Sequence, residues 1–300
     1  MESSIVTTLL LPVALGIVML GLGLSLTVAD FARVVRYPKA VLVGLFAQTV
    51  VLVAGAYVIA RLAALPPELA VGLMLLAASP GGATANIYSH LAHGDVALNI
   101  TLTAINSLLA LVTLPLIVDA ALVHFLGQDQ YVPPPTRKVI EVAAIIVLPV
   151  LIGMALRAGL PKVAAALEKP IRLFAVLVLV AVIGAAIVAE WERLPGFIAA
   201  VGAACLAFNL LSMAVGYGLP RLLNLPRSQA IAISMEIGIH NGTLAIFIAL
   251  TVLQNATMSV PAAVYSIIMF VTAGAFTFWL NRRPGSGHDA SGARSSPPHR

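Results

Sequence analysis

Charged residues are scarce in this 300-residue chain, because Asp, Glu, Lys and Arg together make up only 10% of it. A soluble domain carries about 25% charged residues. Hydrophobic residues account for 60% of the sequence, and its mean hydropathy is +1.03. These values exclude an ordinary soluble protein. They predict an integral membrane protein whose apolar surface faces lipid.

Cysteine is almost absent, and this excludes two further classes of protein. The single Cys205 lies in an apolar run, so the chain has no disulfide framework and no cysteine metal site. The sequence also lacks the nucleotide-binding loop of a primary pump, the Gly-x-Ser-x-Gly motif of hydrolases and the His-Glu-x-x-His motif of zinc proteases. We therefore do not expect an enzyme. The net charge of +5 does not indicate nucleic-acid binding, because the basic residues fall in short loops beside apolar segments.

Nine apolar segments are long enough to cross a bilayer as helices. Strands of an outer-membrane barrel alternate at a period of two, whereas these segments are continuously apolar, so the predicted fold is all-α. The expected transporter domain covers residues 1–281, and residues 282–300 have the composition of a disordered cytoplasmic tail. The predicted spans are 5–28, 40–63, 68–91, 96–118, 139–160, 171–189, 196–219, 228–253 and 260–280.

Lys and Arg are distributed unevenly between the loops. With the amino terminus outside, 13 of the 17 basic residues lie on the cytoplasmic side and 4 outside. The positive-inside rule requires such an excess on the cytoplasmic side. We therefore expect a multi-pass protein of the cell (inner) membrane, with its amino terminus outside and its carboxyl terminus in the cytoplasm.

Two predicted spans contain helix-breaking residues near their middle. Residues 79–86 read Ser-Pro-Gly-Gly-Ala-Thr-Ala-Asn, and residues 236–243 read Glu-Ile-Gly-Ile-His-Asn-Gly-Thr. Each lies in the second-to-last span of its half, the halves being divided by the long loop 119–138, and the two spans cross the membrane in opposite directions. Matching interruptions in oppositely oriented halves predict an inverted-repeat transporter with its site at the midplane.

Glu236 is the one acidic residue that cannot be placed near a membrane surface. A charge at the bilayer centre opposes insertion, so a carboxylate retained there is expected to bind something. Na⁺ prefers oxygen ligands, from carboxylates, carboxamides, hydroxyls and unwound backbone carbonyls. Asn106 and Ser107 could equally form hydrogen bonds between helices. The polar residues within the predicted spans that supply such oxygens are Gln48, Thr84, Asn86, Asn99, Thr103, Asn106 and Ser107.

These motifs resemble the bile acid:sodium symporter family. The resemblance rests on Ser-Pro-Gly-Gly at 79–82 with Asn86, on His-Gly-Asp-Val-Ala-Leu at 93–98, and on Glu-x-Gly-x-x-Asn at 236–241. It covers nearly the whole chain, from Gly21 to the ninth span. It implies a core domain with two crossed, broken helices and a panel domain beside it. The implied activity is Na⁺-driven symport of an organic anion by alternating access, with no obligate protein partner.

The resemblance also implies where sodium and solute bind. The solute would sit against the breaks, where helix amino ends could attract a carboxylate. The implied first sodium site uses Asn86, Asn99, Thr103 and Glu236. The second uses Gln48, Glu236, the carbonyls of Ile237 and Ile239, and the position held by His240. The implied solute site lies near Ala83, Thr84, Asn241 and Gly242.

The sequence departs from the family pattern at several of these positions. Ala85 and Asn99 stand where serine is common, so one hydroxyl is lost and a longer carboxamide takes the place of another. His240 stands where glutamine is usual, and an imidazole with an ordinary pKa of about 6.5 is a poor Na⁺ ligand but a proton acceptor. Our hypothesis is that a proton on His240, paired with Glu236, replaces the second cation; alternatively His240 donates a hydrogen bond and Na⁺ still binds.

Three functions remain open besides sodium symport of an organic anion. They are a proton-coupled symporter that uses His240, a sodium/proton antiporter and a channel. An antiporter usually needs several intramembrane carboxylates, and Glu236 is alone. Residues 267–270 are apolar where bile-acid-binding relatives carry polar side chains, which favours a smaller keto- or hydroxy-acid over a bile acid.

Overall fold

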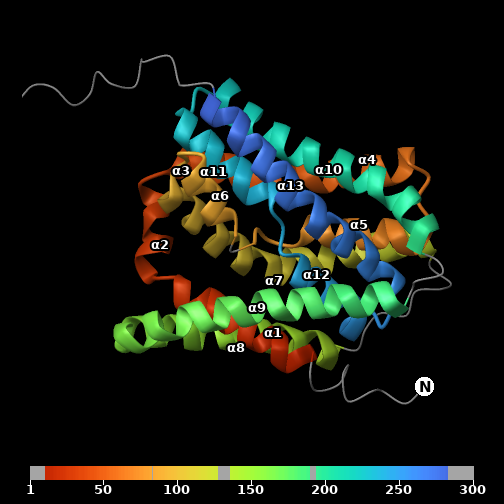
Figure 1. The fold of residues 1–300 in the computed structure, drawn as a ribbon, viewed down its shortest axis with the longest axis horizontal. Helices are drawn as coiled ribbons and strands as arrows, with labels where there is room; N and C mark the ends of the chain where they lie inside the picture. The colour runs from red at the N-terminus through yellow and green to blue at the C-terminus, as the bar shows by residue number, and fades with distance from the viewer. Residues whose placement is uncertain (1–10, 83, 128–135, 190–193, 283–300) are drawn as a thin grey trace, which may run out of the picture.

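A computed structural model describes residues 11–82, 84–127, 136–189 and 194–282 of the chain (Figure 1). Within these residues the secondary structure is helical, apart from one isolated bridge between Gly81 and His240, which confirms the predicted all-α class. The helices are α1 (Leu11–Ser25), α2 (Val28–Ala32), η2 (Arg33–Val35), α3 (Pro38–Phe46), η3 (Ala47–Leu52), α4 (Val53–Leu62), α5 (Pro67–Ala78), α6 (Ala85–Leu91), α7 (Val96–Leu126), α8 (Thr136–Gly159), α9 (Pro161–Ala189), α10 (Leu194–Leu222), α11 (Arg227–Gly238), α12 (Gly242–Phe247), η4 (Ile248–Val252), η5 (Thr257–Ser259) and α13 (Val260–Arg282).

Several helices in the described part of the chain can cross a membrane unbroken. Four are long and apolar enough by length and composition, and a fifth candidate is the bent pair formed by α1 and α2. These helices make the chain a multi-pass membrane protein. The four unbroken helices are Pro38–Leu62, Val96–Leu126, Val201–Leu222 and Thr257–Arg282.

Some helices extend beyond the predicted spans. Helix α9 begins at Pro161 rather than at residue 171, and α7 continues to Leu126 rather than ending at 118. The hydropathy of a segment finds only its apolar part, whereas a helix continues for as long as its own backbone hydrogen bonds are made. The predicted start of the first span, residues 5–10, lies outside the described residues.

The first predicted span, residues 5–28, contains a break near its end that was not predicted. Helix α1 ends at Ser25, and the chain bends by 66° into the helical segment that starts at Val28. The side chain of Asp30 accepts hydrogen bonds from the backbone nitrogen and the hydroxyl of Thr27, at 2.6 and 2.7 Å, and it pairs with Arg33. This capping box starts a new helix and so sets the position of the bend.

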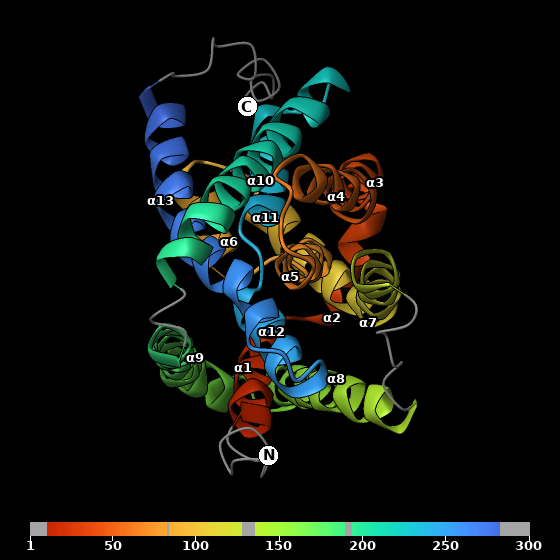
Figure 2. The same cartoon turned by 90° about the vertical axis from the view of Figure 1, so that its right-hand side faces the viewer.

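The helices form two groups, which the two views show from different sides (Figures 1 and 2). Helices α1, α8 and α9 pack against one another. The other group contains α3, α4, α5, α6, α7, α10, α11 and α13, in which α5 packs on α7 and α10 packs on α11 and α13. Helix α12 contacts α13 of the second group and α1 of the first, so it lies where the two groups meet.

Two helices are interrupted, and their interruptions meet. Between α5 and α6, and between α11 and α12, the backbone leaves helical geometry. The backbone nitrogen of Gly82 donates to the carbonyl oxygen of Ile239 at 2.7 Å, and that of Asn241 donates to Pro80 at 2.8 Å. Backbone groups that a broken helix would leave unpaired in a membrane are thus satisfied by the other broken helix.

Candidate functional site

Glycines allow the two interrupted helices to cross closely. A Cβ atom on Gly81 would lie 2.2 Å from Oε1 of Glu236, and one on Gly82 would lie 3.1 Å from the carbonyl oxygen of His240. Any side chain at residue 81 would therefore displace the carboxylate. The Gly-Gly pair lets one backbone lie directly against the carboxyl group carried by the other helix.

The carboxylate of Glu236 is fully buried at this crossing. Its Oε2 accepts a hydrogen bond from the Thr103 hydroxyl at 2.6 Å, and its Oε1 accepts a weaker one from Asn106 Nδ2 at 3.4 Å. Both of these partners are neutral side chains. A buried carboxylate held only by neutral groups favours binding of a cation.

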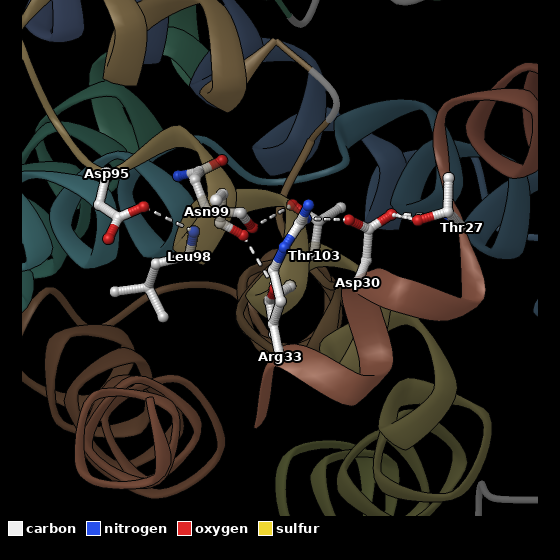
Figure 3. A network of polar contacts seen from close by, with 9 residues as sticks. Thr27, Asp30, Arg33, Asp95, Leu98, Asn99 and Thr103 are labelled. Carbon is white, nitrogen blue, oxygen red and sulfur yellow. Dashed lines mark hydrogen bonds and ion pairs between the residues drawn. The ribbon is translucent and has the colours of Figure 1, made fainter. Parts of the chain in front are cut away.

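Helix α7 places a row of polar side chains along the crossing (Figure 3). Asp95 caps the helix by accepting a hydrogen bond from the Leu98 nitrogen at 3.0 Å, and Asn99 and Thr103 follow one turn apart. Asn99 reaches across to α11, where its Nδ2 donates to the carbonyl of Ala232 at 2.8 Å. Asn106, for which either a structural or a functional role was open, contacts the carboxylate directly.

Five buried carboxamide oxygens around the crossing have no hydrogen-bond partner among the described residues. The orientation of four of these amides is settled, because their nitrogen faces a carbonyl or carboxylate oxygen, which can only accept. A buried acceptor left unpaired costs about 1–3 kcal/mol, and a hard cation would satisfy it. The five atoms are Gln48 Oε1, Asn86 Oδ1, Asn99 Oδ1, Asn106 Oδ1 and Asn209 Oδ1.

The carbonyl oxygen of Ser79 joins two residues of the predicted second sodium site. It accepts hydrogen bonds from Gln48 Nε2 at 3.1 Å and from His240 Nδ1 at 3.2 Å. Because this carbonyl can only accept, the His240 hydrogen lies on Nδ1 and leaves Nε2 as an acceptor. That Nε2 is buried without a partner in the described part of the chain, so the expected pairing of His240 with Glu236 is not observed.

The remaining ligands expected for the second site are main-chain carbonyls. Ile239 already accepts the hydrogen bond from Gly82 and retains a second lone pair, while Ile237 is buried in the last turn of α11. The donor set therefore consists of neutral oxygens around one carboxylate. Among the described residues, no group of three His, Cys, Asp or Glu side chains could hold a metal ion. A single negative charge surrounded by neutral oxygens suits a monovalent cation better than a divalent one.

The residues predicted to bind solute are only partly brought together. Asn241 caps α12, since its Oδ1 accepts from the Leu244 nitrogen at 3.1 Å, and it lines a cavity of about 500 Å³. Gly242 instead packs against Ser266 of α13, and Thr84 does not line that cavity. Ala83 lies outside the described residues.

Two residues that support the crossing were not predicted as part of the site. Asn209 Nδ2 and the Tyr265 hydroxyl both donate to the carbonyl oxygen of Gly238, at 3.0 and 2.9 Å, where α11 ends. They also bond to each other at 3.0 Å. The sequence did contain a signal for this contact, because an Asn or Tyr side chain inside a membrane helix needs a hydrogen-bond partner on another helix.

The chain is similar to known membrane transporters. The model of the Sodium Bile acid symporter family matches residues 12–195. The chain is 29% identical to the "Uncharacterized sodium-dependent transporter YocS" of Bacillus subtilis over 254 residues, which cover 84% of this chain and 77% of that protein. It is 30% identical to the "Probable sodium/metabolite cotransporter BASS2, chloroplastic" of Oryza sativa subsp. japonica over 277 residues, covering 91% of this chain and 64% of the plant protein. Both names describe transporters, as expected for a chain that is not an enzyme.

Proposed function

This chain belongs to the sodium bile acid symporter family, and we propose that it is a secondary transporter that couples the entry of Na⁺ to the symport of an organic anion. The observation that carries the proposal is the Glu236 carboxylate, fully buried where two broken helices cross and surrounded by carboxamide oxygens without partners. Such a group is costly in a membrane unless it binds a cation.

The proposed first sodium site consists of Asn86, Asn99, Thr103 and Glu236. Thr103 already contacts the carboxylate at 2.6 Å, and the side-chain oxygens of both asparagines are buried and available. Asn99 supports the idea that a carboxamide replaces the usual serine, because its nitrogen is fixed on Ala232 and its oxygen remains for the ion.

The proposed second sodium site consists of Gln48, Glu236, His240 and the carbonyls of Ile237 and Ile239. The buried Oε1 of Gln48 supports this assignment, since its amide nitrogen is held by the carbonyls of Ala77 and Ser79 and the oxygen is thereby directed elsewhere. Residues Ala83, Thr84, Asn241 and Gly242 are the proposed solute contacts at the crossing.

Charge balance explains why sodium and an anion would move together. Two Na⁺ ions beside one ionised carboxylate leave one uncompensated positive charge, and an unpaired charge in a low-dielectric interior is strongly unfavourable. An organic anion at the crossing would neutralise this charge, so the binding of Na⁺ and the binding of the anion favour each other. We also propose for this chain the architecture that the family implies, with nine spans, inverted repeats, core and panel domains and an external amino terminus. Alternating access would move the group of α1, α8 and α9 relative to the crossing.

A proton-coupled symporter is the second candidate. The observation that favours it is the buried, unpartnered Nε2 of His240, which is an acceptor in the tautomer set by Ser79. In that case a proton on His240 would replace the second Na⁺. A sodium/proton antiporter is the remaining alternative for the same carboxylate.

Uptake into proteoliposomes tests these functions against one another. A panel of labelled organic anions is offered with inward Na⁺ and H⁺ gradients imposed separately. The proteins compared are the wild type, Glu236→Gln and, as a control, Glu68→Gln, which lies in the first turn of α5 at the end opposite its break. We expect concentrative uptake driven by Na⁺, abolished by Glu236→Gln and retained in the control. Uptake driven by H⁺ alone would favour the second candidate. If neither gradient drives accumulation of any anion, symport is wrong.

A further inference from the structure

Asn106 differs from three other buried carboxamides at the crossing in the group that its nitrogen faces. The amide nitrogens of Gln48, Asn99 and Asn209 donate to main-chain carbonyls, so their orientation does not depend on an ion. The nitrogen of Asn106 instead faces Oε1 of Glu236, at 3.4 Å. The Asn106 amide is therefore oriented by the carboxylate that is the proposed cation ligand.

The oxygen of the same amide has no partner. Asn106 is 2% exposed, and its Oδ1 makes no hydrogen bond within the described part of the chain. The neighbouring Ser107 lines the apolar cavity of about 500 Å³, whereas Asn106 is not among the described residues that line it. Its oxygen is therefore better placed for a ligand of the carboxylate than for a solute in the cavity. A buried acceptor without a partner is costly, and a hard cation would satisfy it.

Helix α7 places Asn106 beside the residues of the proposed first sodium site. Asn99, Thr103 and Asn106 are separated by four and then three positions, and residues with this spacing share one face of a helix. The Thr103 hydroxyl donates to Oε2 of Glu236 at 2.6 Å, so successive turns of α7 contact the two oxygens of one carboxylate. An ion bound at Oε1 would therefore lie next to the Asn106 amide.

A cation at Glu236 would reverse the preferred orientation of this amide. Without an ion, the carboxylate attracts the N–H group of Asn106 and repels its oxygen, whereas a cation at Oε1 would repel the N–H group and attract the oxygen. The terminal torsion of an asparagine is broad and roughly twofold, so a half-turn exchanges the two ends of the amide without moving the helix. In Gln48, Asn99 and Asn209 the same turn would set the amide oxygen against a carbonyl oxygen.

We propose that Asn106 is a further sodium ligand whose amide turns when the ion binds. In the ion-free protein its N–H group contacts the carboxylate, and in the bound protein its Oδ1 coordinates Na⁺ together with Glu236. This inference rests on the proposed function, because it takes Glu236 as a cation ligand. It adds to the first site an oxygen ligand that the family resemblance does not imply.

Removing the amide distinguishes a ligand from a hydrogen-bond donor, because the two roles change sodium affinity in opposite directions. A group that only donates to the empty carboxylate competes with Na⁺, so Asn106→Leu would then leave sodium affinity unchanged or make it tighter. If Oδ1 is a ligand, the same substitution weakens sodium binding. Leucine is similar in size to asparagine, so the substitution leaves no large cavity.

Thermal unfolding of the purified full chain measures sodium affinity, with NaCl replacing choline chloride at constant ionic strength. We expect the Na⁺ concentration that gives half of the stabilisation to rise at least tenfold in Asn106→Leu. Thr101→Val is the matched control and should leave it unchanged, because it removes a hydroxyl from a buried residue of α7 that donates to Ala97 of the same helix. Asn106→Asp should bind Na⁺ at least as tightly as the wild type and should also be stabilised by CaCl₂, since a second carboxylate oxygen in contact with the ion favours Ca²⁺.

The turn of the amide has a spectroscopic signature of its own. In protein whose asparagines carry carbon-13 in the side-chain carbonyl, replacing choline by Na⁺ should shift an infrared carbonyl band in the wild type. That band should be missing from the difference spectrum of Asn106→Leu and present in that of Thr101→Val. A difference spectrum that is the same in the wild type and Asn106→Leu would overturn the turn of the amide.

The outcomes separate this inference from the proposed function. Unchanged or tighter sodium binding in Asn106→Leu would overturn the role of Asn106 as a ligand and leave sodium symport standing. An Asn106→Asp variant that gains no stabilisation from CaCl₂ would also overturn it, and this result can be read even where the leucine variant does not fold. A wild type that is not stabilised by Na⁺ would contradict sodium symport itself, and the inference with it.

Discussion

Replacing Gly81 by alanine should displace the carboxylate at the centre of the proposed site. The added Cβ would lie 2.2 Å from Oε1, 2.3 Å from Cδ and 2.7 Å from Oε2 of Glu236. Carbon atoms in favourable contact are separated by about 3.5–4.0 Å, so the carboxyl group has to move by more than ~1 Å. Glu236 is fully buried and Gly81 is also buried, which leaves the carboxyl group little room to move.

Two effects of different size follow from this overlap. Overpacking in a dense interior costs about 1–3 kcal/mol of folding stability. A misplacement of about 1 Å at a site that depends on geometry costs about 100-fold in function. Sodium binding should therefore be lost while much of the folded protein persists. Gly274→Ala is the matched control, because the same methyl group there meets no atom within 4 Å.

Thermal unfolding in NaCl, compared with choline chloride, measures sodium binding without knowledge of the solute. A cation present at 100 times its dissociation constant stabilises the folded state by about 2.7 kcal/mol. We expect this stabilisation in the wild type and in Gly274→Ala but not in Gly81→Ala. A shorter carboxylate should relieve the contact, so the double variant Gly81→Ala/Glu236→Asp should recover part of it. Full stabilisation of Gly81→Ala by NaCl would refute the geometry of the crossing and the role of Glu236.

Three other changes test separate parts of the site. Gln48→Leu removes an unpartnered oxygen and the two hydrogen bonds that its amide nitrogen donates to backbone carbonyls. The Na⁺ concentration that gives half of the thermal stabilisation should therefore rise at least tenfold, and an unchanged value would exclude Gln48 as a ligand. Tyr265→Phe removes a hydrogen bond to the Gly238 carbonyl and should lower the free energy of unfolding by about 1 kcal/mol, measured in denaturant, with sodium affinity little changed because Asn209 still holds that carbonyl. His240→Gln should retain Na⁺-driven uptake with a flat response between pH 5.5 and 7.5; loss of an H⁺-driven component present in the wild type would instead identify His240 as the proton carrier.

Local features of the sequence were enough to predict the class of fold, the two helix breaks and a carboxylate buried beside them. Helix and membrane propensity depend on consecutive apolar residues, and a break depends on Pro and Gly within a few positions, so both can be recognised without tertiary contacts. The same is true of Glu236, whose cost in a membrane follows from its position in an apolar run. Thr103, predicted beside it, donates the shortest hydrogen bond to the carboxylate.

The partners of each polar atom could not be predicted in this way, because they come from segments distant in the chain. The Ser79 carbonyl accepts from both Gln48 and His240, and His240 consequently does not pair with Glu236. Asn209 of α10 likewise donates to the carbonyl of Gly238 at the end of α11.

The sequence by itself determined that this chain is helical, lies in a membrane and carries one carboxylate beside two helix breaks, since those properties follow from hydropathy and backbone chemistry over short stretches. Only the tertiary structure decided that the breaks hydrogen-bond to each other, that Gly81 faces the carboxylate and that Asp119 borders the apolar cavity. The physical reason is that helix packing selects which buried groups meet, and each buried polar atom then takes the partner that packing provides.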